Sequence, residues 1–156
     1  MTSACSGIDA MRSKCINATN PSTYAVIFDK GDELITGLTR FAIEKVLSGS
    51  QINAVGGFSH ATIGFFDRDR KDYKKIELDE QVEVLCLFGD ITIEGGTPKV
   101  HAHAIIGRAD GTTRGGHLIK ALVWPTLEVI VTESPGYLVR RHDPDTGLAL
   151  IDPEAE

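Results

Sequence analysis

The periodicity of the apolar residues changes once along the chain, and this change limits the fold more than any other feature. Between residues 33 and 47 the apolar side chains recur at helical spacing, at Leu34, Leu38, Phe41, Ala42, Val46 and Leu47. From Ile52 onward, Gly, Asp and Pro divide the chain into short β-type runs. One early helix and six to seven later strands predict an α+β fold, with the helix packed on a mixed or mainly antiparallel sheet.

Local signals set the expected limits of these elements. Asp32 is a plausible N-cap for the helix. Asp110-Gly111 is typical of a hairpin turn. Proline cannot donate a hydrogen bond within a central ladder, so Trp124-Pro125 predicts a strand break or bulge. A strand is expected before the helix, within "TYAVIFDKGDE", and it stops at Lys30-Gly31. The expected strand runs after the helix are 52–59, 60–67, 73–81, 82–96, 99–110, 117–125 and 126–134.

The length of 156 residues suits a single domain. We expect a flexible leader over residues 1–21, because this stretch is polar and aperiodic. The folded domain is expected over residues 22–139 and an extended tail over residues 140–156. Within the tail, residues 148–151 are apolar enough to add a short strand or to dock on a neighbour.

The net charge, the length of the apolar runs and the cysteine content indicate which partners and which cellular compartment to expect. The formal net charge is −6, so duplex DNA is a doubtful partner, because non-specific binding relies on cationic side chains. No apolar run approaches the roughly 18 residues that span a membrane, and no membrane partner is expected. Three cysteines without a C-x-x-C argue against a disulfide framework. Together these features predict a cytoplasmic protein.

Three of the five histidines lie within residues 99–118. On a strand, His101 and His103 share one face and lie roughly 7 Å apart along the chain. A hairpin at Asp110-Gly111 would bring His117 back past that face. Three histidines with an open fourth position are a pattern of catalytic zinc sites, although nickel, iron, manganese and copper also accept imidazole. The alternatives are histidines that bond backbone carbonyls, or that line a subunit interface and titrate there.

Four further residues have both a functional and a structural interpretation. His60 either reaches the metal site or lies on the surface, and Arg114 either binds an anionic ligand or is a turn arginine. Glu128 either faces inward, next to a metal site, or is a solvated strand residue. Tyr73, in the basic stretch 67–75, is either a stacking platform for nucleic acid or part of a solvated hairpin tip, and the interspersed acidic residues favour the tip.

A family resemblance rests on the order of several motifs. These are "GDELITGLTRFAIEKV", "ATIGFFD", "QVEVLCLFGDI", "VHAHAIIGRADGTTRGGHL" and "TLEVIVTE". In this order they resemble the plants and prokaryotes conserved (PCC) domain over about residues 22–135. The resemblance implies an α+β fold, a homotrimer and a structural kinship with acetolactate decarboxylase, whose zinc is held by three histidines. Carried over residue by residue, those ligands fall on His101, His103 and His117, with a different spacer before the third.

The resemblance also bears on nucleic acid binding. In plants the domain often follows an AT-hook, a basic segment centred on G-R-P that enters the minor groove, and its relatives are commonly named as candidate DNA-binding proteins. This chain contains no G-R-P, and its only G-R is Gly107-Arg108.

Three classes of function therefore compete. The first is a metal-dependent enzyme or small-molecule binder that resembles acetolactate decarboxylase, with no general acid or base evident. The second is a nucleic-acid-binding protein, and the third is a trimeric interaction module whose histidines are structural or respond to pH.

Overall fold

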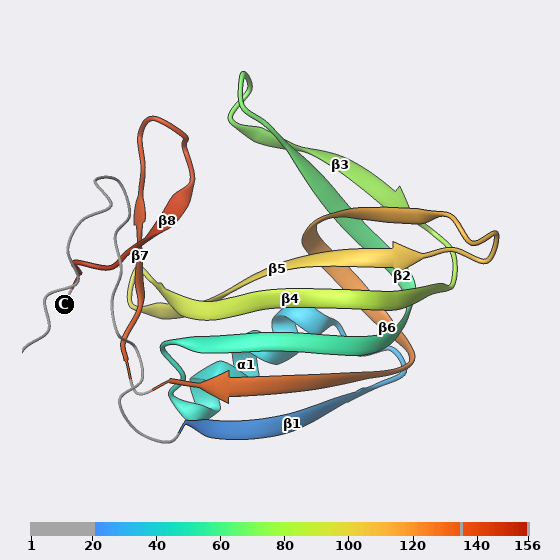
Figure 1. The fold of residues 1–156 in the computed structure, drawn as a ribbon, viewed down its shortest axis with the longest axis horizontal. Coiled ribbons are helices and arrows are strands. Elements are labelled where there is room, and N and C mark those ends of the chain that lie inside the picture. Colours follow the sequence, from blue (N-terminus) through green and yellow to red (C-terminus); the bar gives the residue numbers. More distant parts are fainter. Residues whose placement is uncertain (1–20, 135, 156) are drawn as a thin grey trace, which may run out of the picture.

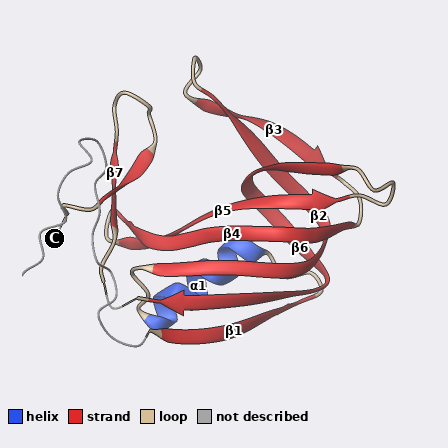
Figure 2. Ribbon diagram, in the orientation of Figure 1, coloured by secondary structure: helices blue, strands red, loops and turns tan. Residues whose placement is uncertain are grey.

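The computed structural model describes residues 21–134 and 136–155. Over these residues the chain forms one helix and a sheet of eight mostly antiparallel strands (Figures 1 and 2). The α+β class is therefore confirmed. The helix is α1 (Leu34–Lys45), and the strands are β1 (Ser22–Asp29), β2 (Ser50–Asp67), β3 (Asp72–Leu78), β4 (Val82–Glu94), β5 (Thr97–Gly107), β6 (Thr113–Glu133), β7 (Val139–His142) and β8 (Ala149–Asp152).

The strand count of six to seven was too low. Four of the expected runs merge in pairs into the long strands β2 and β6, because their apolar pattern continues across the expected breaks. Strand β1 confirms the strand expected before the helix, and β7 and β8 add to the count after residue 138. The short strand expected near residues 148–151 is present as β8.

Helix α1 begins one residue later than expected. Its N-cap is Glu33 rather than Asp32, and the Glu33 carboxylate accepts hydrogen bonds from the backbone N–H groups of Ile35 and Thr36. The carboxylate of Asp32 instead accepts from the backbone N–H of Asp29 in the preceding turn. The helix ends at Lys45, and its buried side chains, which pack into the core, are Leu34, Leu38 and Ala42.

The sheet curls because two strands change partners along their length. The first half of β2 lies between β4 and the second half of β6, whereas the second half of β2 lies between β3 and the first half of β6. From β2 the pairing runs through β4, β5 and β6 and returns to β2. Helix α1 covers one face of the curled sheet (Figure 1).

The bend coincides with the irregularity that was expected at Trp124-Pro125. The register between β2 and β6 shifts there, so that Gly56 opposes Leu127 while Phe58 opposes Val123. A Cβ on Gly56 or on Gly57 would collide with the backbone of β6 at this point, so the two glycines allow the strands to approach. The irregularity is confirmed, but the strands continue through it.

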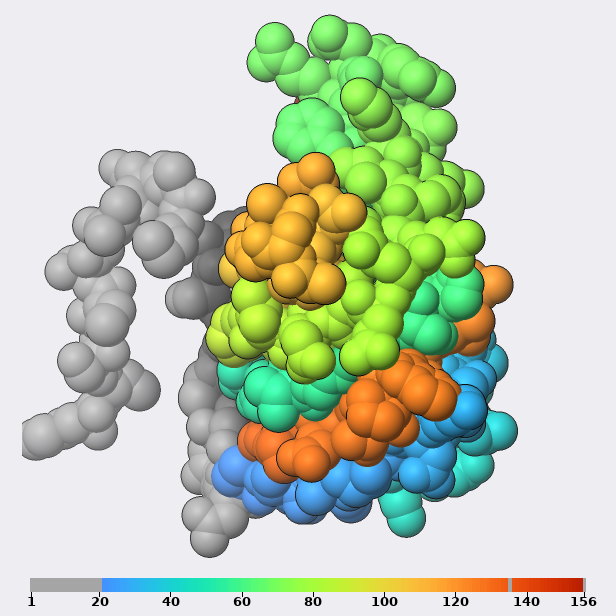
Figure 3. All heavy atoms as spheres, turned by 90° about the vertical axis from the view of Figure 1, so that its right-hand side faces the viewer, coloured from blue at the N-terminus to red at the C-terminus, as the bar shows by residue number. Residues whose placement is uncertain are grey.

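Strands β7 and β8 form a hairpin that joins the sheet at one end of β4. Ile93 and Glu94 of β4 pair in parallel with Val139 and Arg140 of β7. This hairpin and the β2–β3 hairpin rise on the same side of β5 (Figure 1), and the Lys71 ammonium donates to the carbonyl of Pro144 between them. Figure 3 shows the β2–β3 hairpin from the end of the sheet, standing above the β5–β6 turn.

The expected flexible leader lies outside the described residues, apart from residue 21, and the domain division stays a prediction. Over the described part of the chain, no helix combines the length and the apolar character needed to cross a membrane.

Candidate metal centre

The structure brings together the three histidines that the sequence singles out. His101 and His103 lie on β5, and His117, on β6, is the direct register partner of His103. The ring centroids of the three pairs are 5.2, 5.2 and 5.5 Å apart. One nitrogen from each ring lies within 4.8 Å of the other two, so the three residues form a group able to hold one metal ion.

Two hairpins supply the surroundings of this group. The ring of Tyr73, on β3, stacks on that of His117 with 4.5 Å between centroids and 22° between planes. Beside the histidines lies a cavity of about 250 Å³, which the β7–β8 hairpin helps to line. Its lining includes Tyr73, Lys99, His101, His117, Arg140 and Leu148.

Two charged side chains contact Nδ1 of the His101 ring. Asp90, on β4, is the register partner of His101, and its Oδ2 lies 3.5 Å from Nδ1 of that ring. Nη2 of Arg140, on β7, donates to Oδ1 of Asp90 at 2.7 Å. Burial alone would raise the pKa of Asp90, but the hydrogen bonds from His101 and Arg140 outweigh it and hold the pKa below its ordinary value.

Two of the histidines are held in the neutral form. Burial lowers the pKa of His117 to about 4, and the nearby charges of His101, His103, Lys99 and Arg140 add to this effect. His103 is exposed to solvent on one side, but partial desolvation by its neighbours, with the charge of His101, also lowers its pKa. Metal ligation requires a deprotonated imidazole nitrogen, so both rings are in the form that a metal binds at neutral pH.

Acid is expected to destabilise the metal-free protein through His117. Its folded pKa of about 4 lies below the ordinary value of 6.5, so the unfolded chain takes up the proton first. The free energy of unfolding should therefore fall between about pH 6.5 and pH 4 and lose nothing more through this residue below pH 4. Urea unfolding at pH 7 and pH 5 measures the effect, and the pH dependence should be smaller in His117→Gln. An equal pH dependence in this variant would contradict the assignment.

A buried nitrogen provides an independent test of whether these residues fit a metal. Nδ1 of His117 is buried and has no hydrogen-bond partner among the described residues. A buried polar atom without a partner is costly and therefore uncommon. The three-imidazole donor set suits zinc and the neighbouring divalent transition metals. The residues present therefore fit the group that the sequence predicts.

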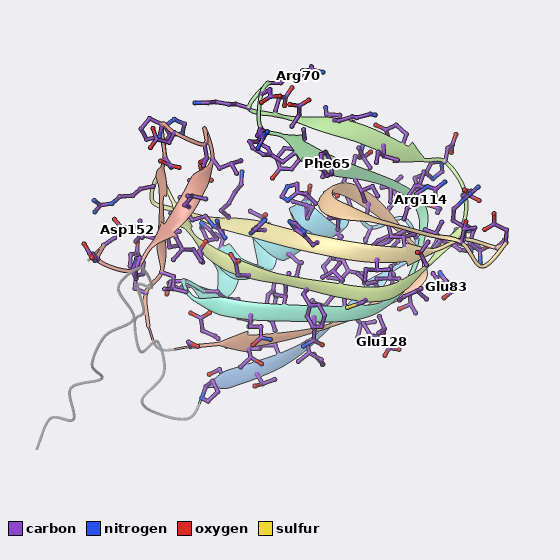
Figure 4. The ribbon with its side chains drawn as sticks, turned by 45° about the horizontal axis from the view of Figure 1, so that its top comes forward. Phe65, Arg70, Glu83, Arg114, Glu128 and Asp152 are labelled. Atoms are coloured by element: carbon purple, nitrogen blue, oxygen red, sulfur yellow. The ribbon has the colours of Figure 1, made fainter. Side chains whose placement is uncertain are left out.

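The other candidates lie away from the histidines. His60 is exposed and forms an ion pair with Asp79 beside a different hollow. Arg114 opposes the buried Ile106, and its odd spacing from His117 places it on the opposite face of β6. Figure 4 shows Arg114 near the β5–β6 turn.

Glu128 is exposed on β6, beyond the bend, where its register partners are Ile27 and Val55. The basic stretch 67–75 forms the end of the β2–β3 hairpin, as the solvated-tip interpretation requires. Tyr73 differs from both expectations, because its ring lies on His117.

Sequence reasoning missed Asp90 and Arg140, although one of them had a signal. A hairpin centred on Gly95-Gly96 pairs Glu94 with Thr97, and counting back along both strands pairs Asp90 with His101. Arg140 had no such signal, because its position depends on the parallel pairing of β7 with β4.

Comparison with known proteins gives a consistent family match. A model of the Plants and Prokaryotes Conserved (PCC) domain matches residues 16–135. The chain is 37% identical over 120 residues to the bifunctional protein GlmU of Synechococcus, a match that covers 75% of this chain but 18% of that relative. The chain thus spans less than a fifth of the length of this curated relative.

Several solved structures share the fold. A metal-containing protein from Archaeoglobus fulgidus is 33% identical, with a TM-score of 0.82 over 89% of this chain and 99% of that chain. A plant- and prokaryote-conserved protein from Pyrococcus horikoshii is 32% identical, with a TM-score of 0.80 over 84% and 91%. A candidate DNA-binding protein from Bacteroides thetaiotaomicron is 29% identical, with a TM-score of 0.82 over 85% and 93%.

The resemblance to acetolactate decarboxylase extends to the fold alone. A Staphylococcus aureus protein of unknown function, similar to that enzyme, is 13% identical, with a TM-score of 0.53 over 70% of this chain and 51% of that chain.

Proposed function

The chain belongs to the PCC family, and on that premise we propose that His101, His103 and His117 hold one divalent transition-metal ion, with zinc as the first candidate. The observation that carries this proposal is the convergence of the three rings, with one nitrogen of each within 4.8 Å of the others. The partnerless buried Nδ1 of His117 supports it, as does the metal in the 33% identical Archaeoglobus protein.

The three histidines would hold the ion, and the ion would supply a Lewis acid for an oxygen of a small molecule. The surrounding residues would receive that molecule. Tyr73 stacks on the His117 ring. The cavity has apolar walls at Leu148 and Leu150, and its cation, Lys99, pairs with the Glu94 carboxylate at 3.6 Å. The proposed function is thus metal-dependent binding or turnover of a small molecule.

Metal content tests this proposal directly. Protein purified without a histidine tag and without chelator should contain about one equivalent of transition metal per chain. Metal removed by a chelator should return on addition of Zn²⁺ alone. Protein that contains no metal and takes up none from micromolar Zn²⁺ would refute the proposal.

DNA binding, the function suggested by the names of some relatives, is expected to be absent. The net charge is −6, and the acidic residues are interspersed among the basic ones at the β2–β3 hairpin tip. Micromolar protein should therefore produce no shift of duplex DNA in a gel at low salt, where cation-driven binding is strongest. A shift that weakens with added salt would instead support the DNA-binding alternative.

The face of the sheet that carries the histidines also exposes apolar side chains, and these are the basis of a proposal on self-association. Direct register partners form a row across five strands, and partners in register point to the same face. The row consists of Ala25, Ile130, Asn53, Phe88 and His103, with Ile27, Val55 and Ile105 exposed beside it. We propose that further copies of the chain cover this face, which is mainly apolar but carries Glu128 between Ile27 and Val55, giving the homotrimer that the family resemblance implies.

Charge on this face is expected to break the assembly. Phe88 is 60% exposed and lies in the middle of the row, so Phe88→Glu should place a charge in the interface. The mass in solution, measured by light scattering, should then fall from trimer to monomer. Ile43→Glu, on the exposed surface of helix α1, is the matched control and should leave the mass unchanged. A wild-type protein that is already monomeric would contradict the proposal.

The same mass measurement separates a structural ion from a ligand-binding one. If the metal serves the small-molecule site, the trimer should persist after chelation. Dissociation on chelation would support the interaction-module alternative, in which the ion is structural.

A further inference from the structure

We infer that Asp90 and Arg140 are positioning residues of the proposed metal centre, which fix the His101 ring so that its Nε2 faces the metal. This inference rests on the proposed function. Neither residue belongs to the three-histidine group, yet both contact the same ring nitrogen of His101.

The contacts at His101 assign its two nitrogens to different tasks. Nδ1 faces Asp90 Oδ2 at 3.5 Å and Arg140 Nη2 at 3.1 Å, so two side chains occupy that side of the ring. Nε2 is therefore the nitrogen left for a metal. A ligating histidine commonly donates its other N–H to a carboxylate, which fixes the tautomer and makes the ligand more basic.

Metal binding at Nε2 would decide which of the two neighbours of Nδ1 is its hydrogen-bond partner. When Nε2 binds a metal, the ring proton is on Nδ1, and a guanidinium N–H cannot donate to a protonated nitrogen. Asp90 is the acceptor on that side of the ring, since its Oδ2 faces Nδ1 while its Oδ1 accepts from Arg140. The arrangement is a carboxylate–histidine–metal relay, in which Asp90 orients the ring.

Arg140 in turn holds Asp90 in place. Its side chain is 8% exposed, and each of its three nitrogens has a partner. Nε donates to Thr92 Oγ1 at 2.8 Å, Nη1 donates to the carbonyl of Ala149 at 2.9 Å, and Nη2 donates to Asp90. With these donors engaged, Arg140 is suited to positioning rather than to ligand binding, and it ties the β7–β8 hairpin to the metal centre.

The next residue provides a matched control. Arg141 lies on the same strand and is 65% exposed, and it pairs with Asp152 across the β7–β8 hairpin instead of with β4. Arg140→Met and Arg141→Met therefore remove the same charge and the same donors, at two adjacent positions that differ in contact with the centre.

The experiment measures Zn²⁺ affinity by competition with a chromophoric chelator. Asp90→Asn and Arg140→Met should each lose about 10- to 100-fold in affinity, the usual cost of removing a partner of a metal ligand. Arg141→Met should remain at the wild-type affinity. In the zinc-loaded protein, the Nδ1–H proton of His101 should be visible by NMR, because its hydrogen bond slows exchange with water. It should be lost from the spectrum of Asp90→Asn.

The outcomes separate this inference from the proposed function. If wild type binds no Zn²⁺, the proposed function fails. If wild type binds one equivalent through the histidines while Asp90→Asn and Arg140→Met bind as tightly, the positioning role is wrong and the metal centre stands. Circular dichroism checks the fold of each variant. Should Arg140→Met not fold, the nearly isosteric Asp90→Asn decides the question through its affinity and its Nδ1–H signal.

Discussion

Alanine at both His101 and His103 is expected to abolish metal binding while the fold is retained. The double variant removes two of the three imidazoles that converge on one point, and His117 alone is a weak ligand. The loss of Zn²⁺ affinity should therefore exceed the roughly 10- to 100-fold cost of removing a partner of a ligand. Elemental analysis and chelator competition measure it.

The fold should survive because of where the two side chains lie. His103 is exposed and His101 is half-buried, so their removal leaves no cavity in the core. The matched control is His60→Ala, which removes an exposed histidine at a different hollow and should keep the wild-type metal content. A double variant that contains as much metal as the wild-type protein would refute the site.

Alanine at Gly89 is expected to damage both the fold and the centre. A Cβ at this position would collide with the carbonyl oxygen of His101 and would lie 2.9 Å from Cα of Ala102. Both obstacles belong to the backbone of β5, which cannot rotate away as a side chain can. Strands β4 and β5 must then separate next to Asp90 and His101, and forced overpacking typically costs about 1–3 kcal/mol. Urea unfolding measures this loss, and chelator competition measures the accompanying loss of Zn²⁺ affinity.

The strand on the other side of β5 offers the control for this substitution. Gly115 lies on β6, and a Cβ there would have its nearest atom, the carbonyl oxygen of Ala104, at 3.3 Å. Gly115→Ala should therefore cost clearly less than Gly89→Ala. If Gly89→Ala were as stable as wild type, β4 and β5 would separate without penalty. This result would contradict their close approach at Gly89.

The three-histidine group was predictable because it depends on short-range rules. Alternation along one strand places His101 and His103 on the same face, and a hairpin at Asp110-Gly111 fixes His117 opposite His103. The class of the fold was likewise predictable, since one amphipathic helix before a series of strands leaves few architectures. Both conclusions use contacts between residues that are close in sequence.

The rest depends on contacts that no local pattern encodes. Whether Glu128 belonged to the site depended on the bend in β2 and β6, which puts it beyond the histidines. Tyr73 reaches His117 because β3 and β6 flank β2, an arrangement set by the whole sheet. Arg140 meets Asp90 across 50 positions of chain, through two parallel residue pairs that periodicity does not reveal.

The order of these residues along the chain has a consequence for synthesis. A ribosome releases the chain from its N-terminus, so Tyr73, Asp90 and all three histidines emerge before Arg140. The β5–β6 hairpin is local and can form early, whereas the β7–β8 hairpin docks on β4 only once residues 139–152 have emerged. At the proposed metal centre, a nascent chain would thus hold metal loosely until Arg140 has emerged and docked, and more tightly afterwards.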